Sequence, residues 1–82
     1  MTDTKCNGWK NYQTWNVALW VQNDEDIYNI ALKYLKTSKR QSWTGFIRFA
    51  GLEGKRTADR ISYSGTRLDY AALSRMLREL AA

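Results

Sequence analysis

Aromatic side chains are the feature that most restricts how this chain can fold. A domain of this size buries only about 60–65% of its unfolded surface, so its stability margin is small. The 82 residues include one cysteine and no histidine, which leaves neither an internal disulfide nor a thiolate or imidazole cage to hold the fold. Four Trp, five Tyr and two Phe are the large groups that remain. We therefore expect a single domain, residues 1–82, around an aromatic core; dimerisation is the other way to complete such a core.

Hydrophobic spacing predicts a mainly α fold, a compact bundle of about four short helices. The predicted helices cover residues 12–22, 24–37, 43–50 and 70–80. Their expected caps are Asn11 or Thr14, the acidic segment 23–26, Ser42 and Asp69. The first helix is apolar almost all round, which is typical of a buried helix. A strand is the alternative for residues 12–22 and, because Gly45 weakens a helix, for residues 43–49.

Two segments are predicted to lie outside the helices. They are a flexible N-terminal arm, residues 1–10, and a basic loop, residues 51–67, which contains three glycines. Within this loop, residues 60–64 alternate polar and apolar side chains, which predicts one short extended segment.

The positive charge is concentrated in the middle of the chain. Residues 1–32 carry 2 cations and 4 anions, residues 33–67 carry 9 and 2, and residues 68–82 carry 2 and 2, so the net charges are −2, +7 and 0. Such a surface is a candidate for contacts with phosphates or an acidic protein, and the alternative is a solvated surface that keeps the protein soluble. The candidate basic residues are Lys36, Lys39, Arg40, Arg48, Lys55, Arg56, Arg60 and Arg67. The candidate aromatic contacts are Trp43 and Tyr63, which lie beside these cations in the sequence and could stack on bases, and Trp9.

Groups that perform catalysis or hold a metal are missing from this sequence. Cys6 has no histidine to activate it, and the carboxylates of residues 24–26 are interpreted as a helix start. Residues 54–57 are not a phosphate loop, because the first glycine and the hydroxyl directly after the lysine are missing. We therefore expect no enzyme activity, no catalytic residue, no metal site and no cofactor. The longest apolar run, residues 17–21, is too short to span a membrane, so a soluble cytoplasmic protein is expected.

The stretch from Asn7 to Trp20 combines aromatic rings with side-chain amides. One interpretation is a cap-and-core motif, and the other is a binding site that displays Trp9 or Tyr12. Over residues 7–35 the chain resembles small proteins of bacteriophages and other mobile elements that share an N-Y-x-T-W-N-V-x-L-W opening. The resemblance implies an accessory protein acting in the cytoplasm of a bacterial host, and it carries over no functional residue.

Three functions follow from these observations as hypotheses. The first is a small non-enzymatic binding protein that inhibits or redirects a host protein or nucleoprotein complex, for example a CRISPR-type defence effector. The alternative is a basic nucleic-acid-binding protein that contacts phosphates non-specifically. The second alternative is a structural or homo-oligomeric accessory protein, such as a homodimer.

Overall fold

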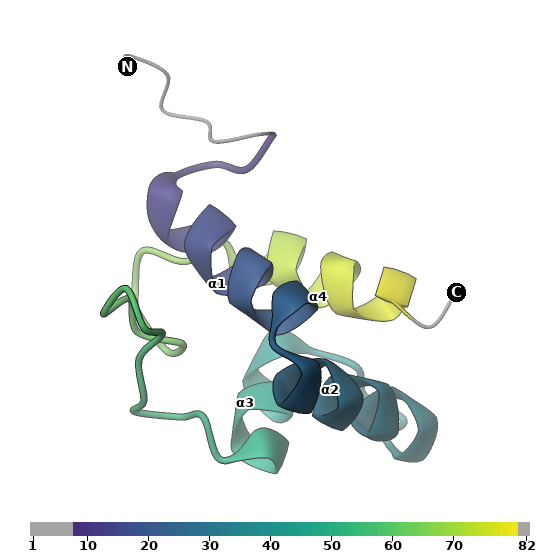
Figure 1. The fold of residues 1–82 in the computed structure, drawn as a ribbon. Helices are drawn as coiled ribbons and strands as arrows, with labels where there is room; N and C mark the ends of the chain where they lie inside the picture. Colours follow the sequence, from purple (N-terminus) through teal and green to yellow (C-terminus); the bar gives the residue numbers. More distant parts are fainter. Residues whose placement is uncertain (1–7, 81–82) are drawn as a thin grey trace.

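Four helices form a mainly α bundle, as predicted (Figure 1). A computed structural model describes residues 8–80, and the helices are α1 (Tyr12–Asn23), α2 (Glu25–Thr37), α3 (Trp43–Ala50) and α4 (Tyr70–Leu80). The strand alternatives for residues 12–22 and 43–49 are therefore wrong. None of the helices in residues 8–80 is long and apolar enough to cross a membrane. Residues 1–7 of the predicted flexible arm, with Cys6, lie outside the described range.

Each helix begins at a side chain that accepts a hydrogen bond from the first turn. Asn11 Oδ1 accepts from the Thr14 amide at 2.9 Å, so Asn11 rather than Thr14 caps α1. Asp24 does the same for α2 and Ser42 for α3, while Asp69 Oδ1 accepts from the Ala72 amide at the start of α4. These caps occupy amide groups that the first turn of a helix leaves unpaired. The predicted helix boundaries are accurate because these caps are encoded locally.

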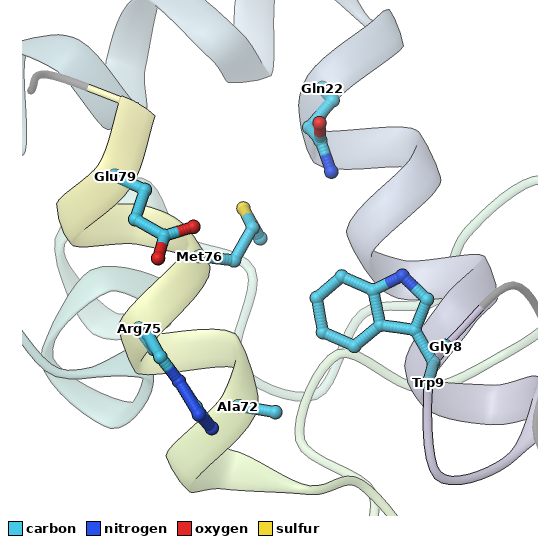
Figure 2. Close-up of a pocket in the computed structure, with 7 residues that line it drawn as sticks. All are labelled: Gly8, Trp9, Gln22, Ala72, Arg75, Met76 and Glu79. Carbon is cyan, nitrogen blue, oxygen red and sulfur yellow. The ribbon is translucent and has the colours of Figure 1, made fainter.

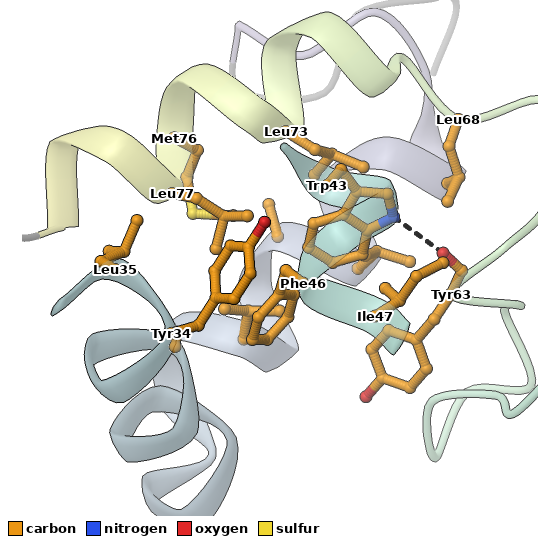
Figure 3. Packing of buried hydrophobic residues seen from close by; sticks show 14 residues of the cluster. Tyr34, Leu35, Trp43, Phe46, Ile47, Tyr63, Leu68, Leu73, Met76 and Leu77 are labelled. Carbon is orange, nitrogen blue, oxygen red and sulfur yellow. Dashed lines mark hydrogen bonds between the residues drawn. The ribbon is translucent and has the colours of Figure 1, made fainter. Parts of the chain in front are cut away.

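The core lies between the helices and is centred on Trp43, which is fully buried (Figure 3). The centroid of its ring lies 5.3 Å from that of the Phe46 ring, and its Nε1 donates to the main-chain oxygen of Tyr63 at 2.8 Å. A buried indole N–H needs such a partner, so this bond holds the end of the basic loop against α3. The buried cluster is Val17, Ala18, Val21, Ala31, Tyr34, Leu35, Trp43, Phe46, Ile47, Tyr63, Leu68, Leu73, Met76 and Leu77.

Gly45 stands in α3 because a larger residue would meet the Tyr34 side chain. A Cβ at this position would collide with the Tyr34 hydroxyl oxygen. That hydroxyl donates to the main-chain oxygen of Arg40 and accepts from the Ser42 amide at 3.2 Å. The glycine thus weakens α3 locally but leaves room for the Tyr34 hydroxyl of α2, which binds the main chain of the link between α2 and α3.

The basic loop, residues 51–67, contains one isolated antiparallel bridge, Arg56 with Ser62, and no strand. The Thr57 amide donates to Ile61 O at 2.9 Å and the Tyr63 amide to Lys55 O at 3.0 Å, so the chain turns back on itself here. The extended segment predicted near residues 60–64 is therefore reduced to this short pairing.

Candidate functional site

The basic loop is held against α1 by the side chain of Asn16. This residue is buried, with an exposed fraction of 1%. Its Oδ1 accepts from the Thr57 hydroxyl at 2.8 Å, and its Nδ2 donates to Asp59 Oδ2 at 2.7 Å. Trp20 Nε1 donates to the same carboxylate oxygen at 3.1 Å. The side-chain amide of Asn16 and the indole N–H of Trp20, both on α1, therefore hold the turn of the loop in place.

Thr57 closes the turn from inside. Its hydroxyl oxygen accepts from the amides of Asp59 and Ile61, each at 3.2 Å, while its hydrogen goes to Asn16. Thr57 is 6% exposed, and its hydroxyl finds both its acceptor and its donors within the protein. A buried network in which every member is paired specifies one conformation, so the 57–61 turn is preorganised.

The far end of the loop is attached to the first turn of α1. Asn11 Nδ2 donates to the main-chain oxygen of Arg67 at 2.8 Å, and the Asp69 amide donates to Thr14 Oγ1 at 3.0 Å. The polar residues of the opening motif thus cap α1 and bind the basic loop. Their arrangement supports the cap-and-core interpretation of Asn11, Thr14 and Asn16.

Asp59 remains ionised at the turn, and its charge faces α1. The hydrogen bond from Asn16, followed by that from Trp20, lowers the pKa of this carboxyl. The side chains of Lys55, Arg56 and Arg60 are exposed. The loop therefore presents three cations to solvent, while its single turn carboxylate is occupied by two donors from the helix.

Arg60 holds a backbone conformation that a side chain disfavours. Within residues 8–80 it is the one non-glycine residue with a positive φ, 68°. The Arg60 amide donates to Thr57 O at 2.8 Å, so this residue closes the turn. The left-handed conformation costs a non-glycine residue on the order of 1–3 kcal/mol and persists only where its surroundings impose it. The anchored turn supplies that constraint, and it keeps an exposed guanidinium where glycine or asparagine would be less strained.

The eight predicted basic residues are all exposed, but they do not form one patch. Lys55, Arg56 and Arg60 share the basic loop, which runs beside α1 in green in Figure 1. Lys36 lies in the last turn of α2, and Lys39 and Arg40 belong to the link that follows this helix. In Figure 1 the C-terminal end of α2 lies on the opposite side from the basic loop.

The other two predicted cations are placed separately. Arg48 on α3 forms an ion pair with Glu53, with Nε and Oε2 3.3 Å apart. Arg67 lies beside the Asn11 cap of α1. Sequence reasoning missed Arg78, whose Nη1 donates to Gln41 O at 3.2 Å and adds a cation to the α2–α3 link. Nothing in the local sequence brings α4 to that link, so no signal would have revealed it.

Two of the three predicted aromatic contacts are wrong. Trp43 is 0% and Tyr63 3% exposed, so their rings belong to the core and cannot stack on a base (Figure 3). Burial, with the Asp24 charge as a second cause, raises the pKa of Tyr63. An aromatic residue next to cations in the sequence need not be exposed, because the rings of Trp43 and Tyr63 point into the core while the cations beside them face solvent.

Trp9, the third predicted aromatic contact, is partly buried and lines a cavity of about 480 Å³ between α1 and α4 (Figure 2). Met76 lies across from its ring in that view, and Arg75 and Glu79 line the same side of the cavity as Met76. The ring packs against the core cluster. Trp9 is thus partly accessible, but the residues that line its cavity include none of the three loop cations.

Tyr12 is an exposed aromatic side chain beside the basic loop. It is 45% exposed, and its ring centroid lies 5.6 Å from that of Trp15. The Tyr12 hydroxyl accepts from Asn16 Nδ2 at 3.3 Å, from the same nitrogen that binds Asp59. In the sequence, Tyr12 is a candidate only in the alternative interpretation of the opening motif. Its spacing from Asn16, one helical turn, is the signal that connects it with the loop.

Among residues 8–80, no group of three or more His, Cys, Asp or Glu side chains is placed to hold a metal ion. Neither a curated protein nor a solved structure is significantly similar to this chain. A family model matches residues 2–82, and the chain therefore belongs to DUF7249, a family of unknown function.

Proposed function

We propose that this is a small non-enzymatic binding protein of phage or mobile-element type, which attaches to a nucleoprotein complex of a bacterial host and inhibits or redirects it. The contact is made to the phosphates of the nucleic acid in that complex, through the basic loop. The observation that carries this proposal is the anchored 57–61 turn, which displays a strained Arg60. The exposed Lys55 and Arg56 precede this turn and are paired with the chain that follows it. The opening motif supports the phage or mobile-element setting.

Anchoring matters because it removes part of the entropic cost of binding. A loop that is already ordered loses less freedom when it meets a partner, so its cations contribute more to affinity. Asn16 and Thr57 order the turn from the inside, and their bonds leave the cationic side chains free to face a phosphate chain. A surface whose only task is solubility needs neither a fixed turn nor an arginine in a left-handed conformation.

Non-enzymatic action is supported by the chemistry of the sequence. No histidine is present, and Asp59, the carboxylate at the turn, is occupied by Asn16 and Trp20. A binding protein needs charge and shape instead, and the net charge of +5 supplies the attraction to nucleic acid.

Fluorescence anisotropy with labelled DNA and RNA over a range of salt concentrations tests the phosphate contact. The logarithm of the association constant should fall linearly with the logarithm of the salt concentration. Each of the variants Lys55→Gln, Arg56→Gln and Arg60→Gln should reduce the magnitude of this slope by about 0.7–0.9. Lys33→Gln makes the same charge change at an exposed site on α2 and should leave the slope within error of wild type. Absence of binding at low salt, or binding that salt does not affect, would contradict the proposal.

Affinity purification from a bacterial host lysate tests the nucleoprotein partner. The wild-type protein should recover a complex that is lost after nuclease treatment and lost with the triple variant Lys55→Gln, Arg56→Gln, Arg60→Gln. A complex that survives nuclease but needs the three cations would show that the partner surface is an acidic protein, and the nucleic-acid part of the proposal would be wrong.

A further inference from the structure

We infer that the outer face of α1 that carries Tyr12 and Trp15 is a platform for the bases of a single-stranded nucleic acid whose phosphates lie along the adjoining cations. This inference rests on the proposed function and specifies its ligand. Both aromatic rings come from one helix, and the anchored turn is fastened to that same helix.

The shared contact at Asn16 places the platform beside the basic loop. Asn16 Nδ2 donates to both Tyr12 Oη and Asp59 Oδ2, at 3.3 and 2.7 Å. The ring of Tyr12 therefore adjoins the turn that ends in Arg60. A nucleotide stacked on this ring would have its backbone within reach of the cations of the turn.

Other cations surround the first turn of α1. Lys10 is exposed and precedes the cap residue Asn11, and Asn11 itself holds the main chain of Arg67. The twelve residues of α1 include no charged side chain. The carboxylate of the adjoining turn, Asp59, is exposed, and its Oδ2 accepts from Asn16 Nδ2 and Trp20 Nε1. Neutral aromatic groups bordered by cations are the combination that single-strand-binding proteins use.

Exposure distinguishes Tyr12 from the core aromatic residues. Its side chain is 45% exposed, and the ring forms a tilted pair with Trp15, which is partly exposed. Phe49 is the other large exposed hydrophobic residue within 8–80, with 46% exposed. Phe49 lies on α3, which does not pack against α1, and its ring contacts that of Tyr34. It is therefore a matched control.

The strand must be single because the platform can use only unstacked bases. In a duplex the base faces are occupied by their neighbours, so a duplex offers these rings no stacking surface and contributes only its phosphates. A single strand offers both the base faces and the phosphates. The inference is thus a preference for single strands that depends on the bases and not on the charge.

Two probes of equal charge separate stacking from phosphate binding. They are an oligothymidylate of about 12 nucleotides and an oligomer of the same length whose residues all lack the base. The oligothymidylate should bind about tenfold tighter than the abasic strand and tighter than a duplex of the same length. Tyr12→Ala should reduce this advantage, because only the Trp15 ring is left to stack, and it should leave the affinity for the abasic strand unchanged. Tyr12→Phe, which keeps the ring, and Phe49→Ala should both bind like the wild type.

Three results would overturn the inference. They are equal affinity for the thymidylate and abasic strands, duplex binding as tight as single-strand binding, and wild-type affinity in folded Tyr12→Ala. If salt-dependent binding persists in any of these cases, the proposed function stands and only the platform is refuted. If neither probe binds at low salt, the proposed function itself fails. A thermal melt of Tyr12→Ala shows whether the fold is intact, and Tyr12→Phe provides the comparison if it is not.

Discussion

Replacing Asn16 with alanine is the sharpest test of how the basic loop is held. Asn16 is 1% exposed, and its amide is the acceptor for the Thr57 hydroxyl at 2.8 Å. Its loss leaves a buried hydroxyl without an acceptor, which costs about 1–3 kcal/mol. The space of the deleted amide adds a smaller term, because the tightly packed interior relaxes only in part. We expect the free energy of unfolding to fall by about 2–4 kcal/mol in total.

This loss is large for a domain of 82 residues. The whole free energy of unfolding is on the order of 4–12 kcal/mol at 0.05–0.15 kcal/mol per residue. Urea denaturation should therefore show a clearly lower midpoint, and the Tm should fall by roughly 8 °C or more. Asn29→Ala is the matched control, because Asn29 is exposed on α2, and it should change the free energy of unfolding by less than about 0.5 kcal/mol.

Hydrogen exchange locates the effect. The amides of Asp59 and Ile61 are bonded to Thr57 Oγ1, so Asn16→Ala should speed their exchange more than that of amides in α2 or α3. A free energy of unfolding within about 0.5 kcal/mol of wild type, together with unchanged exchange in the 57–61 turn, would refute the anchoring argument.

Three further predictions test single contacts. Gly45→Ala should lower the free energy of unfolding by about 1–3 kcal/mol in urea denaturation, because the new methyl group meets the Tyr34 hydroxyl; in a Tyr34→Phe background this cost should shrink, and an equal cost in both would contradict the steric argument. Arg60→Gly should raise the Tm, because it relieves the left-handed strain by up to about 2 kcal/mol after the entropy of glycine is counted, and it should weaken nucleic-acid binding; a lower Tm would show that Arg60 is unstrained. The lowered pKa of Asp59 means that its stabilising contribution is complete above the ordinary aspartate pKa of about 3.9 and is lost as the pH falls through the lower value of the folded state. Between neutral pH and a pH below about 4, the urea midpoint of Asp59→Asn should therefore fall less than that of the wild type. An equal fall in the two proteins would show that Asp59 does not cause the loss of stability in acid.

The helices could be predicted because their signals are local. Ser42 and Gly51 enclose α3, and the structure shows Ser42 as its N-cap and Gly51 as its C-cap with a φ of 74°. The apolar spacing of α4 likewise predicts the burial of Leu73, Met76 and Leu77. Such signals depend on residues within one or two turns of each other, so a single sequence is sufficient to read them.

The site could be predicted only in part because its contacts are remote in sequence. Asn16 meets Thr57 across 41 residues and Asp59 across 43. The direction of Trp43 into the core likewise depends on the packing of α3 between α2 and α4. A count of cations finds the charged loop, but it cannot tell which aromatic residue lies next to it.

The buried polar residues of α1 explain why the same motif has both a structural and a functional interpretation. A helix made only of apolar residues could pack as well in the core, but it would leave the loop free to sample many conformations. Burying the Asn16 amide costs desolvation free energy, and the hydrogen bonds to Thr57 and Asp59 offset this cost. The same bonds fix the turn and thereby the position of Arg60. The conformation of the cationic turn is therefore encoded in the helix, and variants of Asn16 should weaken nucleic-acid binding without removing any positive charge. A variant that loses the loop order yet keeps full affinity would show that charge alone, without the fixed turn, accounts for binding.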